Sequence, residues 1–232
     1  MSTVAIIPAR GGSKRIPGKN LRPFNGLPMM AWSIRAARQA GCFDRIVVST
    51  DDPAIADLAL AEGAEVPFTR PAELADDYTG TVPVIAHALG ELPSATLACC
   101  LYATAPLVQP RYLREGLALL LRNPAKSYAF SVCSFPFPVQ RALVLDDSGA
   151  LTSLYPEYRH TRSQDLPEAY QDAGQFYWGR REAWLRGDTL FSPCSLPVTL
   201  PRYLVQDIDT EEDWRRAEYL HQALRAAGEI DP

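Results

Sequence analysis

The sequence predicts an α/β fold, in which a mostly parallel sheet lies between two layers of helices. The first observation is that strand-like apolar runs alternate with helix-like segments along the chain, as in repeated β-α-β units. The second is that the runs at 4–7 and 96–102 contain no charged residue, which is typical of strands buried on both faces. With 232 residues and no evident linker, we expect one domain with a substantial core.

The first half of the chain alternates regularly between the two kinds of element. A strand at 4–7 is followed by a glycine-rich loop and then by a helix at 28–41, with Pro28 in its first turn and Gly41 at its end. Five elements continue the pattern: a strand at 45–50, a helix at 54–62, a short strand at 65–69, a helix at 83–92 and a strand at 96–102. We expect this last strand to be central, because it is the most apolar.

The second half contains one long irregular segment. A helix at 111–122 and a strand at 127–134 precede residues 135–172, which are rich in Pro, Arg and Tyr and contain only short strand-like pieces. Such a segment in a compact domain is usually functional or an interface arm. The regular pattern then resumes with strand-like runs at 175–178, 195–200 and 204–208 and helices at 181–185 and 211–227.

Composition excludes several classes of protein. The formal net charge of −4 disfavours a nucleic-acid partner. The five cysteines have no C-x-x-C spacing, so we expect free thiols in a reducing cytoplasm rather than a zinc site. No apolar run approaches the ~20 residues that span a bilayer, and none resembles a signal peptide. The sequence therefore predicts a cytoplasmic protein without a membrane partner.

The loop at 7–20 is the strongest candidate site. It follows the first strand, contains Gly11, Gly12 and Gly18, and carries four cations: Arg10, Lys14, Arg15 and Lys19. Glycines permit left-handed backbone and close approach, and successive amides with nearby cations bind anions. We therefore expect a polyphosphate at the carboxyl end of the sheet. The loop is not a P-loop, because Asn20 stands where Ser or Thr would bind magnesium. The alternative is a solvated basic loop.

A pair of carboxylates near the C-terminus suggests a metal site. Asp207 and Asp209 stand two residues apart at the end of the expected strand at 204–208, so both face the same side. Two carboxylates on one face suit Mg²⁺, which also takes phosphate oxygens. The alternative is that Asp209 caps the helix that begins near residue 210. Adjacent acids point to opposite faces of a strand, so three other pairs are poorer candidates: Asp51-Asp52, Asp76-Asp77 and Asp146-Asp147.

These motifs resemble those of the CMP-sugar synthetases, the acylneuraminate cytidylyltransferase family. The resemblance covers essentially the whole chain and rests on five runs: residues 7–20, 49–52, 66–71, 77–79 and 206–214. It departs from the sialate enzymes at Tyr102, which replaces a glutamine near the sugar. The runs at 65–68, 77–81, 135–141 and 171–179 resemble the pseudaminic acid cytidylyltransferase subgroup.

The resemblance implies a Rossmann-like nucleotidyltransferase fold and a Mg²⁺-dependent reaction of CTP with a nonulosonic acid, giving a CMP-sugar and diphosphate for surface glycan or flagellin glycosylation. It implies a homodimer in which the irregular segment reaches the neighbouring subunit. The implied nucleotide-binding residues are Ala9, Arg10, Gly11, Gly12, Ser13, Lys14, Lys19, Asn20, Arg70 and Thr79, and Asp207 with Asp209 forms the implied metal pair. Arg10, Lys14, Lys19 and Asp209 are the catalytic candidates, with Asp209 as the general base, directly or through a water.

The sugar-binding residues are less determined. The candidates are Tyr102, Arg141, Arg162, Gln171 and Gln175, with Arg159 and His160 as further cations in the same segment. Arginine suits a sugar carboxylate and glutamine suits acylamino groups. The alternatives are a solvated arm, salt bridges between subunits and, for Tyr102, a place in the core. The substrate is expected to be pseudaminic acid, with legionaminic, sialic or Kdo-type acids as alternatives. A non-catalytic nucleotide-binding protein is the remaining alternative, since fold does not fix function.

Overall fold

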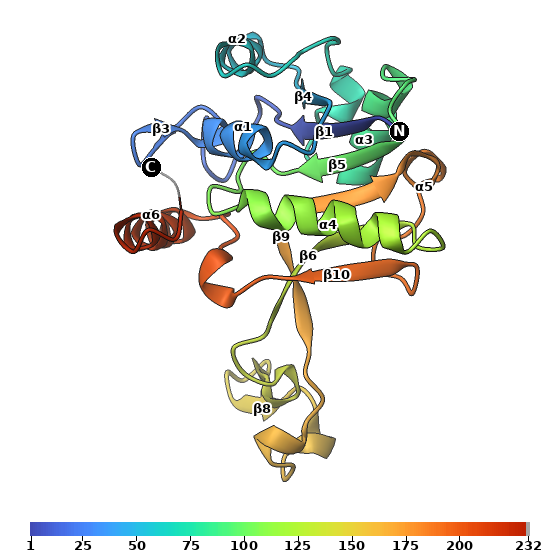
Figure 1. Cartoon of the computed structure of the whole chain (residues 1–232). Coiled ribbons are helices and arrows are strands. Elements are labelled where there is room, and N and C mark those ends of the chain that lie inside the picture. Colours follow the sequence, from blue (N-terminus) through green and yellow to red (C-terminus); the bar gives the residue numbers. More distant parts are fainter. Residues whose placement is uncertain (231–232) are drawn as a thin grey trace.

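A six-stranded sheet forms the centre of the protein, for which the computed structural model describes residues 1–230 (Figure 1). Its strands, in spatial order, are β10 (Ser195–Thr199), β6 (Tyr128–Ser134), β9 (Tyr170–Arg180), β5 (Leu97–Leu101), β1 (Thr3–Pro8) and β4 (Arg45–Ser49). β9 runs antiparallel to β5 and β6, and the other neighbours are parallel. The predicted mostly parallel sheet is confirmed, and β5 is an interior strand, as expected.

Helices cover both faces of the sheet. α1 (Met29–Ala40), α2 (Pro53–Ala61) and α4 (Pro110–Arg122) pack on one face, and α3 (Thr81–Gly90) and α5 (Arg181–Arg186) pack on the other. The alternation of side chains along β1 serves both layers, because Ala5 and Ile7 join the first core while Val4 and Ile6 join the second. The three-layer α/β architecture predicted from the sequence is therefore confirmed.

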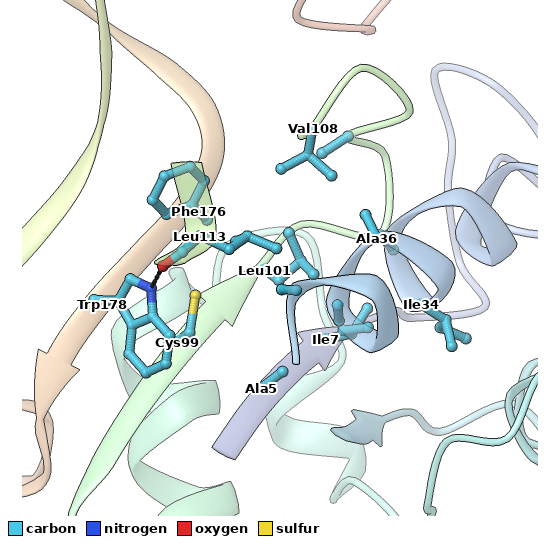
Figure 2. Packing of buried hydrophobic residues seen from close by; sticks show 14 of the residues in the cluster. Ala5, Ile7, Ile34, Ala36, Cys99, Leu101, Val108, Leu113, Phe176 and Trp178 are labelled. Atoms are coloured by element: carbon cyan, nitrogen blue, oxygen red, sulfur yellow. Dashed lines mark hydrogen bonds between the residues drawn. The ribbon is translucent and has the colours of Figure 1, made fainter. Parts of the chain in front are cut away.

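Trp178 ties the antiparallel strand to a helix of the first layer. It is fully buried, and its Nε1 donates a 2.9 Å hydrogen bond to the carbonyl of Leu113 in α4 (Figure 2). Gly116 allows this approach, since a Cβ there would lie 2.7 Å from the Trp178 ring. A buried tryptophan contributes a large apolar area and still needs a partner for its N–H. This contact fixes α4 against β9, next to Cys99 of β5. Cys99 is one of five cysteines, and all five are free thiols, as expected.

Two predicted strands are wrong. Residues 65–69 make only a single bridge, between Val47 and Glu65, because Pro67 has no N–H for a ladder. In the predicted strand at 204–208, Leu204 instead ends a 3₁₀ turn, η5 (Arg202–Leu204), and residues 205–208 have no strand partners. Their apolar side chains pack against helices, and a short apolar run does not show by its periodicity whether it will pair.

The irregular segment forms an arm that projects away from the sheet (Figure 1). It leaves at the end of β6, returns in β9, and contains three 3₁₀ turns and a small hairpin: η2 (Val139–Arg141), β7 (Leu143–Leu145), β8 (Leu151–Ser153), η3 (Pro156–Tyr158) and η4 (Ser163–Asp165). β9 begins at Tyr170, so it starts earlier than the predicted strand at 175–178 and includes the last residues of the predicted irregular segment. The arm is therefore a distinct protrusion built on two strands of the core sheet.

The C-terminal helix α6 (Glu211–Ala226) docks onto the N-terminal part of the chain. Its Trp214 joins a small core with Ile16, Phe24 and Ile208, next to the short strands β2 (Pro23–Phe24) and β3 (Leu27–Pro28). This core brings residues 207–209 beside the loop that follows β1. Within residues 1–230, no helix is long and apolar enough to cross a membrane.

Candidate active site

A cavity of about 610 Å³ opens at the carboxyl ends of β1 and β5. Its described lining carries five cations and two carboxylates: Arg10, Lys14, Arg15, Lys19, Arg70, Asp76 and Asp77. Ser13, Asn20, Thr79 and Tyr102 also line it, so most of the predicted nucleotide-binding side chains are brought together. Such an excess of positive charge in a concave site suits a polyphosphate anion.

The loop after β1 is held in place by the end of β4 and by the turn that leads into α2. Ala9 donates its N–H to the Ser49 carbonyl (3.0 Å), and the N–H of Gly11 bonds Asp51 Oδ1 (3.1 Å). A Cβ at Gly11 would lie 2.5 Å from the side chain of Asp52, which caps α2, whereas a Cβ at Gly12 would meet nothing within 4 Å. The glycine at position 11 therefore permits close packing.

Only one of the three loop glycines adopts the left-handed backbone expected from the sequence. Gly18 has φ 63°, and its carbonyl accepts hydrogen bonds from the N–H groups of Leu21 and Arg22, both 2.9 Å. Gly11 and Gly12 do not have positive φ. The loop therefore turns at Gly18, shortly before Lys19 and Asn20 enter the cavity wall.

Asp77 engages two of the loop cations. Its carboxylate pairs with Arg10 at 2.7 Å and with Lys14, and these hydrogen bonds hold the pKa of Asp77 below its usual range. Arg10 also donates to the carbonyl of Asp76 (2.7 Å). Asp76 Oδ1 accepts from the backbone N–H groups of Tyr78 and Thr79. The two acids therefore contact both the backbone of the cavity wall and two cations of the loop.

Three polar side chains of the cavity lining donate to backbone carbonyls. Arg70 is only 4% exposed and donates to the side chain and the carbonyl of Ser49, and this burial lowers its pKa. Asn20 is also buried and donates to the carbonyl of Arg10 at 3.0 Å. Thr79 Oγ1 donates to the carbonyl of Glu73 at 3.2 Å. Arg70 is therefore a buried cation that is held against the end of β4.

The acid pair lies beside the basic loop. Asp209 pairs with Arg15 Nη1 (2.5 Å) and with Lys19 Nζ (3.6 Å), and Lys19 itself lines the cavity. Ile208 between the two aspartates is fully buried, which anchors both of them. The expected strand geometry at Asp207 and Asp209 is wrong, because this stretch is irregular chain. Tertiary packing of Ile208 places the carboxylates instead.

Thr210 caps helix α6, so the alternative role of Asp209 as the cap is wrong. Thr210 accepts from the N–H of Asp213, and Asp213 Oδ2 accepts from the N–H groups of Thr210 (2.9 Å) and Asp209 (3.2 Å). This reciprocal capping box satisfies donors at the start of the helix. It leaves both oxygens of Asp209 free to face the cations of the loop.

The electrostatics of the acid pair suit a divalent cation. Desolvation and then the charge of Asp209 raise the pKa of Asp207, while desolvation lowers the pKa of Lys19 despite the two nearby aspartates. A nearby positive charge stabilises the ionised forms of two neighbouring carboxylates. No group of three or more His, Cys, Asp or Glu side chains within residues 1–230 forms a metal cage. Mg²⁺ characteristically takes only one or two protein carboxylates plus waters and phosphate oxygens, so the donor set fits it.

Of the predicted sugar-binding residues, Tyr102 lies in the described lining of the cavity and the other four lie elsewhere. Gln175 is buried and donates to the Leu204 carbonyl (2.5 Å), and Gln171 donates to Cys133 Sγ (3.4 Å). The two arginines lie in the arm: Arg141 donates to the Thr161 carbonyl at 2.7 Å, and Arg162 pairs with Asp165 at 2.9 Å. The cavity lining within a single chain thus contains most of the predicted nucleotide-binding side chains but one of the five predicted sugar-binding residues.

Sequence reasoning missed two contributions to the site. Arg15 lines the cavity and pairs with Asp209, although it was counted only as one of the basic residues of the loop. Asp51 accepts the N–H of Gly11 and so orients the loop. The signal for Arg15 was its position between Lys14 and Lys19, whereas nothing local in the sequence links Asp51 to Gly11.

Comparisons with known proteins agree with this architecture. A family model described as Cytidylyltransferase matches residues 4–191. The chain is 42% identical over 226 residues to a pseudaminic acid cytidylyltransferase of Campylobacter jejuni, covering 96% of this chain and 97% of that protein. It is 31% identical to a CMP-N,N'-diacetyllegionaminic acid synthase of Legionella pneumophila, covering 98% and 99% of the two chains.

The fold also matches a solved structure. The structure of a CMP:2-keto-3-deoxy-manno-octonic acid synthetase complexed with CTP superposes with a TM-score of 0.71 at 20% identity, covering 99% of this chain and 100% of that one. The family match ends before the acid pair at 207–209, so it is the structure that joins this pair to the matched basic loop. By the family match and by its full-length relatives, the chain belongs to the cytidylyltransferase family.

Proposed function

We propose that this protein is a Mg²⁺-dependent CMP-nonulosonate synthetase that converts CTP and pseudaminic acid to CMP-pseudaminic acid and diphosphate. The observation that carries the proposal is the convergence of the basic loop and the acid pair at one cavity, through the contacts of Asp209 with Arg15 and Lys19. The choice of sugar is supported by the 42% identity to the Campylobacter jejuni enzyme. The product would serve surface glycan or flagellin glycosylation.

The two ends of CTP would contact different parts of the cavity. Arg10, Lys14 and Lys19 supply charge for the triphosphate, with Ser13 and the loop amides as further donors. The buried side chains of Asn20 and Arg70 offer directed polar groups for cytidine. Pairing of Arg10 and Lys14 with Asp77 keeps these cations near the cavity, where phosphate oxygens compete for them.

Asp207 and Asp209 would hold the magnesium ion. When bound, such an ion supplies electrostatic stabilisation to phosphate oxygens. Two further residues of the chain hold this acid pair at the cavity. Ile208 fixes the two carboxylates, and Lys19, whose pKa is lowered by burial, links Asp209 to the cavity.

The proposed reaction is an in-line displacement at the α-phosphorus of CTP. The anomeric hydroxyl oxygen of the sugar forms a bond to the α-phosphorus while the bond from that phosphorus to the bridging oxygen of the β-phosphate breaks. The hydroxyl proton passes to Asp209, and the electron pair of the broken bond leaves with diphosphate. Arg10, Lys14 and Lys19 stabilise the charge that develops on the leaving group. Most of the remaining rate acceleration comes from positioning the two substrates for the reaction.

Diphosphate release tests the function directly. Purified protein is assayed with CTP and Mg²⁺ against pseudaminic, legionaminic, sialic and Kdo-type acids. We expect the highest kcat/KM with pseudaminic acid. A preference for another of these acids would correct the substrate, whereas tight CTP binding without turnover of any of them would favour the nucleotide-binding alternative.

Asp209→Ala tests the acid pair. We expect a fall in kcat of at least about 100-fold, a typical loss when a catalytic charge is removed. Glu212→Ala is the matched control, because this exposed acid lies in the first turn of α6, just beyond Asp209. A near wild-type rate for Asp209→Ala would show that the metal and base assignments are wrong.

We also propose that the arm pairs with a second copy of this chain and that Arg141 and Arg162 act in the resulting site. Leu145 and Leu151 are paired across the β7–β8 hairpin, and each is 69% exposed; Leu143 is 58% exposed. Exposed apolar side chains on a protrusion favour a protein interface. Leu145→Glu with Leu151→Glu should shift the sedimentation coefficient from dimer to monomer, and an unchanged dimer would contradict the use of this face.

A further inference from the structure

Arg15 occupies one carboxylate oxygen of Asp209 in the free chain. Its Nη1 donates to Asp209 Oδ2 at 2.5 Å, whereas Lys19 Nζ lies 3.6 Å from the other oxygen, Oδ1. Both cations line the cavity, and Asp207 makes no ion pair within residues 1–230. The mechanism proposed above gives Arg15 no role beyond this contact.

The backbone holds Arg15 beside Asp209 through buried neighbours. Ile16 follows Arg15, Ile208 precedes Asp209, and both isoleucines are fully buried in the same small core. The two backbone segments are thus held together by apolar packing that does not involve the charged side chains. Because 194 positions separate Arg15 from Asp209 in the sequence, their contact is a product of the tertiary fold.

The side chain of Arg15 itself is held weakly. It is 71% exposed, and the bond to Asp209 is its only hydrogen bond to the residues that the structure describes. An exposed ion pair contributes little, because solvent screens the charges and fixing a long side chain costs entropy. Lys19 is only 15% exposed, and burial lowers its pKa. Arg15 is therefore the cation that can leave Asp209 more easily.

The charges of this cluster change sign when a divalent cation is added. Two carboxylates, Asp207 and Asp209, balance the two cations Arg15 and Lys19 in the free chain. A divalent ion between the carboxylates satisfies both of them and leaves the two basic side chains without a counter-charge. Phosphate oxygens then become their best partners, and the planar guanidinium of Arg15 can donate two hydrogen bonds to one phosphate.

We propose that Arg15 is the counter-ion of Asp209 only until Mg²⁺ binds, and that it then turns to a phosphate oxygen of the nucleotide. Arg15 is thereby a further substrate-binding residue, and its change of partner couples the binding of metal and CTP. The ion binds more weakly while Arg15 holds Asp209, and CTP gains a ligand once Arg15 is released. The inference rests on the proposed function, from which it takes the metal pair and the nucleotide.

Two binding constants, both measured without sugar, test this role. Mn²⁺ serves as the probe for the metal alone, and the electron paramagnetic resonance signal of the free ion gives its Kd in the absence of nucleotide. Arg15→Gln removes the charge, so we expect the Kd of Mn²⁺ to fall by up to about fivefold, the upper value for an exposed ion pair. Isothermal titration with excess Mg²⁺ should show that the Kd of CTP rises by about fivefold or more, whereas in EDTA it should change by less than about twofold.

Arg186→Gln is the matched control for the loss of an exposed arginine. Its side chain is 61% exposed and pairs with Asp188 at 2.5 Å, much as Arg15 pairs with Asp209, but it lies outside the described lining of the cavity. Both binding constants should keep their wild-type values in this variant. The nearly unchanged Kd of CTP in EDTA shows that Arg15→Gln is folded.

The opposite signs of the two changes distinguish the proposal from simpler roles of Arg15. If Arg15 only binds phosphate, Arg15→Gln weakens CTP binding and leaves Mn²⁺ binding unchanged. If it only holds the acid pair in place, the variant weakens both. Either result overturns the proposal, and so does Mn²⁺ binding that survives Asp207→Ala combined with Asp209→Ala. Failure to turn over any nonulosonic acid would refute the proposed function, but the two binding constants would still decide the role of Arg15.

Discussion

Replacing Ile208 by alanine tests whether the small core under α6 positions the acid pair. Ile208 is fully buried with Ile16, Phe24 and Trp214, and it lies between Asp207 and Asp209. Removing a buried isoleucine side chain to Cβ costs about 2–5 kcal/mol, because apolar contacts are lost and a cavity remains. The neighbouring chain is irregular and has no strand partners, so we expect it to relax toward the cavity and to move both carboxylates.

The magnitude of the catalytic effect follows from this movement. A displacement of about 1 Å in a catalytic group costs about 100-fold in rate. Urea unfolding should therefore show a loss of about 2–5 kcal/mol, and diphosphate release at saturating CTP and sugar should fall by at least about tenfold. The Mg²⁺ concentration needed for half-maximal rate should rise, because the pair that we propose to hold the ion is displaced.

Two control variants make the result interpretable. Ile208→Val should lose only about 0.5–1.5 kcal/mol and keep a near wild-type rate. Leu120→Ala removes an equally buried side chain from the α4 side of the sheet, so it should lower stability by a similar amount without changing the Mg²⁺ dependence. If Ile208→Ala is destabilised as expected but keeps the wild-type rate and Mg²⁺ dependence, the argument that Ile208 positions a catalytic acid pair is refuted.

Three further predictions concern the loop, its counter-ion and a buried histidine. Gly11→Ala should weaken CTP binding by about tenfold or more, since its Cβ would collide with Asp52, whereas Gly12→Ala should be tolerated; isothermal titration with CTP checks both. Asp77→Asn should tighten CTP binding, because Asp77 competes with phosphate for two loop cations, and weaker binding would show that it orients them instead. Burial lowers the pKa of His221 from 6.5 to about 4, so the unfolded chain binds more protons between these values and stability should fall as pH drops through this window. Urea unfolding at pH 7.5 and 4.5 should show up to about 3 kcal/mol of this loss, and His221→Phe should reduce it.

Local signals in the sequence identified most regular elements correctly. The apolar runs predicted β1 and β5, and helix periodicity with a starting proline predicted α1 and α4 to within a residue or two. These predictions succeed because hydrophobic period and capping chemistry act within a few residues. The helix predicted at 54–62 is likewise present as α2, and Asp52 caps it.

The failures occurred where a segment is defined by what it packs against. Residues 65–69 and 204–208 have the composition of strands but do not pair with another strand in a β-ladder. The position of β9 between β5 and β6, antiparallel to both, was not predicted, since strand order depends on pairing between distant segments.

By itself, the sequence determined the α/β class, the basic glycine loop after the first strand and the identity of the acids near the C-terminus. Only the tertiary structure decided that Arg70 is buried beneath the cavity and that Asp209 lies against Arg15 and Lys19. The physical reason is that a side chain's type is local information, whereas its burial and its neighbours depend on the whole packed chain. Here the packing of Ile208 and Trp214 against Ile16 joins the two ends of the chain into one site.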